Sequence, residues 1–424
     1  MTSKIPTSKT VLAKLIEPLD GLIDTCKSRR KCTTLSDQQW IETGLLRIFS
    51  QESSGRAFLQ KIYDSGRTFL GRSLFFEALK SKRRLKLCRE INSAVYTGIM
   101  KKNCVEDPFA HYSELDDYDI FAGDGHYHAA AAHDPKKTGK KYPTQHFYAV
   151  DLRNQALSHL TLADTSGKRK REHDIRALKR LDMETLRQSA PEGKKVLYVW
   201  DRAGIDFMQW FKWKQFGKIY FISREKENMD LMMMAELPFD KKDPINAGVL
   251  SYDYVGCSAG VAMHRVRYQC PVSGKTYNFV TSLPYMSPGL IAYLYKTRWD
   301  VEKIFDEVKN KLSEKKSWAT SETAKTMQAQ FICLAHNLML IFEKILKEIG
   351  IENVKENDRR QARLDKTLKT KSSSEKRKLP KFLTMPKYAT QRSLKFIRWL
   401  RNHLFLNTSW IVAVDSLKRV YSVF

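Results

Sequence analysis

Residues 121–135 contain the first group of side chains that could do chemistry. Their sequence is FAGDGHYHAAAAHDP, which places Asp124 between two glycines and follows it with His126, His128 and His133. His126 and His128 would lie on one face of a strand, because side chains alternate along a strand. Paired imidazoles of this kind bind zinc in hydrolases. Two interpretations follow: a zinc site built on histidines, or a strand that presents one catalytic aspartate.

A second group is spaced for one side of a helix and consists of Tyr295, Arg298, Glu302 and Lys309. At about 100° per residue, these four side chains fall within a stripe roughly 60° wide. An apolar face lies beside the stripe and is formed by Val301, Phe305, Val308 and Leu312. At the edge of a core, a carboxylate can bind a metal and flanking cations can hold phosphate oxygens. A solvated charged face fits the same spacing at least as well.

The helical group resembles the YREK signature, Tyr-x2-Arg-x3-Glu-x6-Lys, of DDE transposases from bacterial insertion sequences, in the branch known as insertion-sequence family four. The stretch YKTRWDVEKIFDEVK, residues 295–309, contains all four residues at all three spacings. Asp124 and Asp201 each end a strand-like run and look like the first two acids of that family. The resemblance covers about 115–320.

The resemblance implies a ribonuclease H-like core in which Asp124, Asp201 and Glu302 are the catalytic and metal-binding acids. Three carboxylates suit two Mg²⁺ ions, for which Mn²⁺ can substitute. The implied enzyme cuts the ends of an insertion sequence and joins the freed 3′-hydroxyls to target DNA, working as a homodimer without a small-molecule cofactor. The glycines beside Asp124 would let metal and DNA backbone approach.

The expected DNA-binding residues come from the signature helix and from two loops: Tyr295, Arg298, Lys309, Arg202, Arg224 and Lys226. The first three carry family roles, with the arginine and lysine on phosphates and the tyrosine on the terminal backbone. Arg202 follows Asp201 and is equally consistent with a plain surface charge. Arg224 and Lys226 follow a strand and could reach the end of the DNA.

The composition favours a nucleic-acid partner. The 424 residues include 74 lysines and arginines against 47 acidic residues, a net charge of +27 that is spread over several basic runs. A phosphate polymer that touches several parts of the protein would neutralise this charge. The seven scattered cysteines lack a CxxC pair, which indicates a reducing compartment. We expect a bacterial, cytoplasmic, nucleoid-associated protein without a membrane segment.

The apolar patterning predicts a mixed α/β fold in three parts. Residues 1–112 are expected to form a helical DNA-binding domain. Residues 113–320 are expected to form the catalytic core, with a β-rich insertion at about 226–286. Residues 321–424 are expected to form a helical region with a flexible basic linker at about 355–381.

The core is predicted to follow the order three strands, helix, strand, helix, strand. The expected strands are 119–125, 146–152, 156–164, 194–201 and 218–225. The methionine-rich run 229–237 is expected in the core or at a hinge.

Two alternatives to a transposase remain open from the sequence. One is a catalytically silent, sequence-specific DNA-binding protein derived from a transposase. The other is a zinc hydrolase built on His126 and His128, for which the remaining histidines supply no further ligand pattern.

Overall fold

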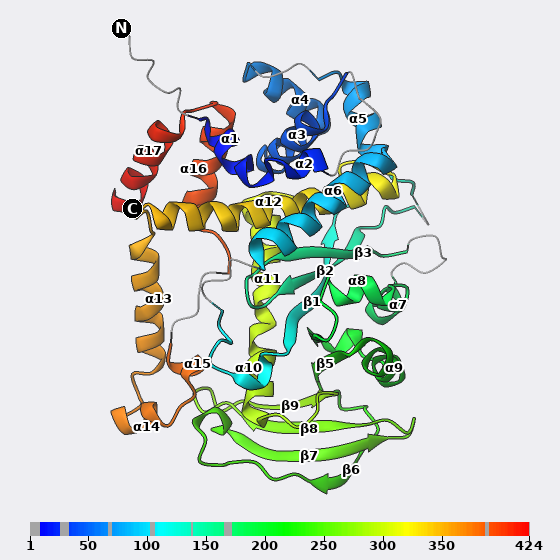
Figure 1. Ribbon diagram of the computed structural model, residues 1–424, viewed down its shortest axis with the longest axis vertical. Coiled ribbons are helices and arrows are strands. Elements are labelled where there is room, and N and C mark those ends of the chain that lie inside the picture. Colours follow the sequence, from blue (N-terminus) through cyan, green and yellow to red (C-terminus); the bar gives the residue numbers. More distant parts are fainter. Residues whose placement is uncertain are drawn as a thin grey trace.

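The protein is built around a nine-stranded mixed sheet, seen in a computed structural model that describes residues 9–25, 34–66, 70–101, 107–136, 139–164, 172–385 and 390–423. The strand order is β3-β2-β1-β4-β5-β9-β8-β7-β6 (Figure 1). Strand β1 lies inside the sheet between β2 and β4, so the candidate residue Asp124 stands on a strand that is paired on both sides.

The first five strands confirm the predicted strands to within a few residues. They are β1 (Tyr118–His128), β2 (Thr144–Asp151), β3 (Leu157–Leu162), β4 (Lys195–Trp200) and β5 (Ile219–Arg224). Strand β2 runs antiparallel to β1 and to β3, whereas β1, β4 and β5 run parallel to one another. Parallel strands end at the same edge of a sheet, which brings the carboxyl ends of β1 and β4 together.

The expected insertion is β-rich and antiparallel, and it extends the same sheet. Its strands are β6 (Leu231–Glu236), β7 (Val249–Cys257), β8 (Ala262–Gln269) and β9 (Thr276–Thr281). Strand β9 pairs with β5, so the insertion continues the main hydrogen-bond ladder. The prediction for 229–237 is wrong: β6 is the outermost strand, and Met232, Met233 and Met234 are exposed there.

Helices cover both faces of the sheet. On one face lie α7 (Asp174–Lys179), α8 (Met183–Arg187) and α9 (Phe207–Gly217), and on the other α10 (Pro288–Thr297), α11 (Trp299–Asp306) and α12 (Glu322–Glu348) (Figure 1). A π-helical turn, Glu307–Lys311, continues α11. The helix expected around residues 295–309 is therefore present, with a break at Arg298 and a wider turn at its end.

The N-terminal and C-terminal regions are helical and pack around α12. The N-terminal helices are α1 (Val11–Ile16), α2 (Leu22–Thr25), α3 (Asp37–Phe49), α4 (Gly55–Asp64), α5 (Arg72–Lys80) and α6 (Lys82–Val95). The last two helices are α16 (Leu394–Phe405) and α17 (Trp410–Val423). Their buried apolar residues join those of the sheet in one continuous cluster. The three expected parts thus share a core, and the boundaries between them stay a prediction.

Helix α12 is also the one helix of the described chain that meets the length and apolarity of a membrane span. Of its most apolar 18-residue window, 72% is buried inside the protein. The helix contacts α6, α3 and β3, which is the environment of a core helix.

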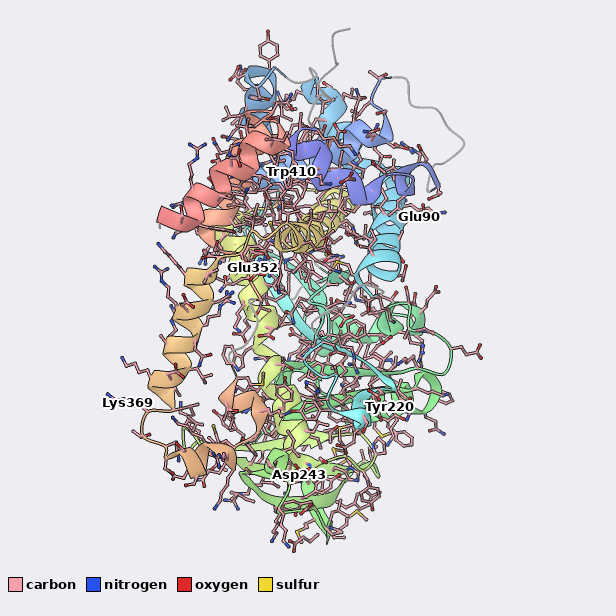
Figure 2. The ribbon with its side chains drawn as sticks, turned by 60° about the vertical axis from the view of Figure 1, so that its left-hand side comes forward. Glu90, Tyr220, Asp243, Glu352, Lys369 and Trp410 are labelled. Carbon is pink, nitrogen blue, oxygen red and sulfur yellow. The ribbon has the colours of Figure 1, made fainter. Side chains whose placement is uncertain are left out.

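The prediction of a flexible linker at 355–381 is wrong, because most of this segment is helical. It forms α13 (Val354–Thr367), α14 (Ser373–Arg377) and α15 (Lys381–Thr384). Asn353 caps α13, and Ser372 forms a capping box with Glu375 at the start of α14. Helix α13 buries none of its residues and projects as an arm between Glu352 and Lys369 (Figure 2). Low hydrophobicity suggested a loop, but caps and strong helix formers suffice for an exposed helix.

Candidate active site

The sheet places two of the expected catalytic acids side by side. Strands β1 and β4 are parallel, with Gly123 opposite Trp200, so Asp124 and Asp201 are the next residues on neighbouring strands. Each carboxylate is held by a backbone amide. Asp124 accepts a hydrogen bond from its neighbour Gly125 at 2.7 Å, and Asp201 accepts one from Ala203 at 2.7 Å. The two acids therefore have fixed directions before any ligand arrives.

The glycine before Asp124 makes room for an aromatic ring and not for a metal or DNA. A Cβ atom on Gly123 would lie 1.3 Å from the ring of Trp200, and one on Gly204 would lie 1.6 Å from the same ring. Trp200 is fully buried between them. The expectation that the glycines beside Asp124 admit metal and DNA is therefore wrong for Gly123, whose missing side chain serves the packing of the strand below the acids.

The third acid reaches the first through an arginine. Arg298, at the junction of α10 and α11, places Nη1 3.1 Å from Asp124 Oδ2 and Nη2 2.8 Å from Glu302 Oε1. The side chain of Arg298 is 8% exposed, whereas that of Glu302 is 38% exposed. The signature helix thus contacts the sheet through a bridging guanidinium, and Glu302 stands at the solvent edge of the site.

The acids lie close enough to perturb one another. Burial raises the pKa of Asp124 to about 7, against the lowering effect of Arg298 and with a further rise from Asp201 and Glu302. A fourth acid, Asp174 at the start of α7, also has a raised pKa because of burial and of Asp201. Sequence reasoning missed its proximity to the expected catalytic acids, because only the packing of α7 beside β3 and the turn after β4 brings it there.

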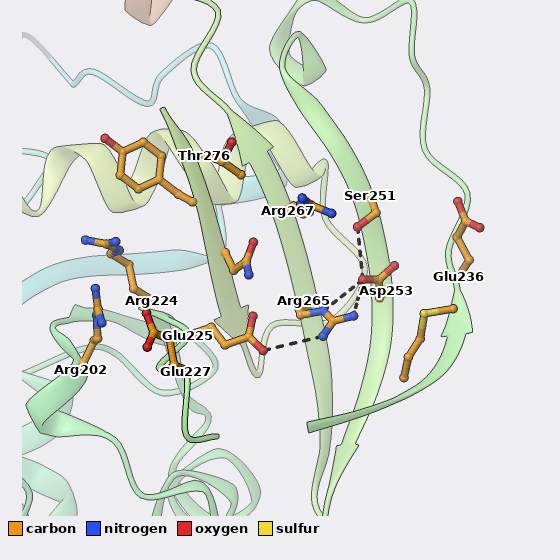
Figure 3. A pocket seen from close by; sticks show the side chains of 13 residues that line it. Arg202, Arg224, Glu225, Glu227, Glu236, Ser251, Asp253, Arg265, Arg267 and Thr276 are labelled. Carbon is orange, nitrogen blue, oxygen red and sulfur yellow. Dashed lines mark hydrogen bonds and ion pairs between the residues drawn. The ribbon is translucent and has the colours of Figure 1, made fainter. Parts of the chain in front are cut away.

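The structure brings two of the three expected loop cations together beside the acids. Arg202 and Arg224 line one pocket of about 590 Å³ that extends over the insertion strands (Figure 3). Arg224 lies 5.2 Å from the ring of Tyr277. Lys226 lies just beyond the end of β5 and is not among the described residues that line this pocket.

The pocket also holds cations that are already paired with acids. Arg265 bonds to Asp253 at 3.0 Å and lies 3.7 Å from Glu225 (Figure 3). Those contacts neutralise Arg265 locally, so the arginines of this pocket do not all present free charge to an anion.

The other signature residues occupy different surroundings. Tyr295 is 8% exposed, packs 4.9 Å from the ring of Phe279, and has a pKa raised by burial. Lys309 lies in the π-helical turn and is exposed. It helps burial to lower the pKa of His126 to about 4, which places it near the histidine end of β1.

The histidines form a row across three strands and not an isolated pair, and all of the row except the half-buried His159 is buried. His126 and His128 on β1 continue to His146 on β2 and His159 on β3, with successive ring centroids 5.1–5.2 Å apart. His146 Nδ1 and His159 Nε2 are 3.0 Å apart. Burial lowers the pKa of His128 and of His159 to about 3, so both rings are neutral. The sequence spacing hid this row, because strand pairing assembles it from three separate segments.

The types of ligand at the three acids fit a hard divalent cation, since all are carboxylates. In the residues that the structure describes, however, no three His, Cys, Asp or Glu side chains converge on one point. At the acids, the Arg298 guanidinium bridges Asp124 and Glu302 as a stand-in cation. The histidine row likewise has no ready-made zinc geometry in the described residues, so the zinc hydrolase is not favoured.

Comparison with known families decides between these chemistries. A family of sequences described as the transposase DDE domain matches residues 117–338, just over half of the chain. The chain belongs to this DDE transposase family. No curated protein matches the sequence significantly.

The DDE transposase match begins at β1 and ends within α12, so it spans Asp124, Asp201 and Glu302 together with the insertion. Membership of the family implies DNA as the substrate. The helices before β1 and the arm from α13 onward lie outside the match.

Proposed function

We propose that this DDE transposase cuts the ends of an insertion sequence and joins the freed 3′-hydroxyls to target DNA, and that its core is ribonuclease H-like and of the YREK branch of family four. The observation that carries the proposal is the placement of Asp124 beside Asp201 by strand register, with Glu302 joined to Asp124 through Arg298. The strand order β3-β2-β1-β4-β5, in which β2 alone runs opposite to the other four strands, supports the core assignment.

Asp124, Asp201 and Glu302 are the proposed ligands of two Mg²⁺ ions, for which Mn²⁺ can substitute. Two such ions supply activation of the attacking oxygen and stabilisation of the leaving oxygen in phosphodiester exchange. The chain's own contribution is to aim the carboxylates: backbone amides fix Asp124 and Asp201, and the position of Glu302 follows from the packing of α11 on β1. The buried ring of Trp200 packs below them against Gly123 and Gly204.

The proposed DNA contacts surround the acids. Arg202, Arg224 and Lys226 approach from the strand ends, and Arg298 and Lys309 from the helix. The buried ring of Tyr295 is proposed to contact the terminal backbone through its hydroxyl edge. The helical parts 1–112 and 321–424 are proposed to add DNA contacts and to support a homodimer in a bacterial, nucleoid-associated complex.

The test uses the inverted repeats that should flank the gene. A duplex carrying such a repeat is incubated with the full chain and Mg²⁺, and nicking at the repeat boundary is measured on a sequencing gel. We expect Glu302→Ala to lower the nicking rate by more than about a hundredfold, since loss of an outer residue of a metal site already costs about 10–100-fold. Its affinity for the duplex should persist.

Asp306→Asn is the matched control, because it removes an exposed acid one turn further along the same helix. It should nick DNA at the rate of the unaltered chain. If the unaltered chain binds the repeat but does not nick it with Mg²⁺ or Mn²⁺, the silent DNA-binding protein replaces the transposase as the explanation.

A further inference from the structure

We infer that Arg298 is an exchangeable counter-ion of the catalytic acids, which leaves them for a DNA phosphate, so that DNA and the divalent cation bind cooperatively. This inference rests on the proposed function, because it concerns the same site. It adds a coupling between two ligands that neither the acids nor the signature spacing requires.

The first support is the geometry of the bridge. The guanidinium of Arg298 gives one nitrogen to Asp124 at 3.1 Å and one to Glu302 at 2.8 Å. It therefore occupies the same two carboxylates that are proposed to bind metal. A guanidinium and a divalent cation repel each other, so both cannot be held closely by these oxygens. Cation binding must weaken or break the bridge.

The second support is that the bridged position leaves Arg298 incompletely satisfied. Its Nε is buried and has no hydrogen-bond partner among the described residues. A buried donor without an acceptor destabilises the state that holds it. An arginine can form bidentate bonds to a phosphate, which would satisfy more of its five donors than the present contacts.

The third support is a short path to the surface. The guanidinium carbon of Arg298 lies 5.8 Å from the ring centroid of Tyr295 and 5.5 Å from that of Trp299. Trp299 is 55% exposed, so one of the two rings that flank the guanidinium faces solvent. A cation can remain in contact with an aromatic face while its charged end turns toward a phosphate.

These observations define two states of Arg298: an inward state that pairs with the acids and an outward state that pairs with a DNA phosphate. A phosphate stabilises the outward arginine and frees the carboxylates, whereas the cation disfavours the inward arginine. Each ligand therefore raises the affinity of the other by the same factor. Without DNA, the inward arginine keeps the acids neutralised and lowers their affinity for the cation.

The experiment measures Ca²⁺ binding, because Ca²⁺ takes carboxylate oxygens as Mg²⁺ does. Isothermal titration of the full chain is performed without DNA and with the repeat duplex, and the titration of the duplex alone is subtracted. The variants are Arg298→Met, which keeps much of the volume, and Arg298→Lys, which keeps the charge. Lys303→Ala is the control, since Lys303 is on the same helix but pairs with Asp300.

We expect DNA to tighten Ca²⁺ binding by the unaltered chain about tenfold, within the usual range of coupling energies. Without DNA, Arg298→Met should bind Ca²⁺ about tenfold more tightly than the unaltered chain, and DNA should add little. Arg298→Lys should fall between the two, and Lys303→Ala should behave like the unaltered chain. Thermal melts establish that each variant is folded.

Equal Ca²⁺ affinity in the unaltered chain and Arg298→Met, with the same effect of DNA on both, would overturn the inference. The reverse direction gives a second readout, because Ca²⁺ should raise the affinity for the duplex in the unaltered chain only. Failure of the proposed function would give a different result. In that case Glu302→Ala would not reduce Ca²⁺ binding, with or without DNA, because the three acids would not form the Ca²⁺ site.

Discussion

The two ends of helix α11 hold two charge clusters of opposite character. At the start of α11, Arg298 bridges Asp124 and Glu302, and the Glu302 side chain remains 38% exposed. At its end, Glu307 is fully buried and meets His336 and Arg392, whose side chains are fully buried as well. The first cluster can exchange partners with solvent or a ligand. The second cannot do so without opening the core.

The second cluster is tied to three other parts of the chain. Glu307 Oε1 lies 3.0 Å from His336 Nδ1 on α12, and Glu307 Oε2 accepts a hydrogen bond from the backbone amide of Arg392. His336 Nε2 lies 3.1 Å from the carbonyl oxygen of Gln155, so both ring nitrogens face oxygen atoms. Burial alone would raise the pKa of Glu307, but Arg392 and His336 lower it to about 2.

The comparison shows that one helix carries a structural cluster at one end and the proposed reactive acids at the other. Glu307 begins the π-helical turn, so the cluster that anchors it also fixes where the helix widens. That anchor sets the height and rotation of α11 over β1. The acids at the other end can then change partners while the helix stays in place.

The largest expected effect comes from breaking the anchoring cluster. Glu307→Ala leaves His336 buried without its carboxylate, whereas Arg392 keeps Glu343 at 3.0 Å. Removal of one partner from a buried pair typically costs about 3–5 kcal/mol. We expect the free energy of unfolding, measured with urea, to fall by this amount. Asp306→Ala, at the exposed neighbouring position, should change it by less than about 0.5 kcal/mol.

Glu302→Ala tests the cluster at the start of the helix in the same way. It removes a half-exposed partner of Arg298, so its cost in stability should stay below about 1 kcal/mol. A loss as large as that of Glu307→Ala would contradict the distinction between the two clusters.

The start of the helix was largely predictable from the sequence and its end was not. Strand composition predicted β1 and β4, and a parallel pairing of these strands brings Asp124 beside Asp201. The helical spacing placed Arg298 one turn before Glu302, which the structure confirms with a 2.8 Å contact. The bridge to Asp124 itself was not predictable, because it depends on how far the helix stands above the sheet.

Long-range pairings account for what the sequence could not reveal. Arg392 approaches Glu307 from 85 residues further along the chain, and the histidine row is assembled by pairing of three strands. The exposed β6 also has an apolar composition that fits a core strand, and only its edge position in the sheet makes it exposed. Local periodicity reports which side of an element is apolar but not which elements meet.

The next expected effect is a dependence of stability on pH. It comes from the neutral histidines of the sheet and not from the cluster around Glu307. The folded pKa values of His128 and His159 are about 3, below the ordinary 6.5, because burial disfavours their charged forms. Between pH 3 and pH 6.5 the unfolded chain binds more protons at these histidines than the folded chain does. Their titration therefore costs no stability above pH 6.5, and the free energy of unfolding decreases as the pH falls below that value. Each histidine should lower the free energy of unfolding by about 1.4 kcal/mol per pH unit below 6.

Urea unfolding at pH 6 and pH 5 measures this slope. His128→Leu should reduce the slope by about one proton, and it should raise stability at pH 7, because neither ring nitrogen of His128 has a partner among the described residues. His111→Leu, at an exposed position, serves as the control. An unchanged slope in His128→Leu would show that acid unfolding starts elsewhere.

The smallest expected effect distinguishes two lysines within the π-helical turn that begins at Glu307. Lys309 is exposed, whereas Lys311 is half-buried and its ammonium donates to the carbonyl oxygen of Arg392. Lys309→Ala should weaken DNA binding modestly and lower the slope of log affinity against log salt by about one, the signature of a single phosphate contact. Lys311→Ala should leave that slope unchanged and instead reduce stability by about 1 kcal/mol, since it removes a hydrogen bond from a charged donor.

Fluorescence anisotropy at several salt concentrations measures the slope, and urea unfolding measures the stability. If the two substitutions gave the same salt slope, both lysines would contact DNA in the same way. The structural cluster around Glu307 would then not be separate from the DNA-binding surface.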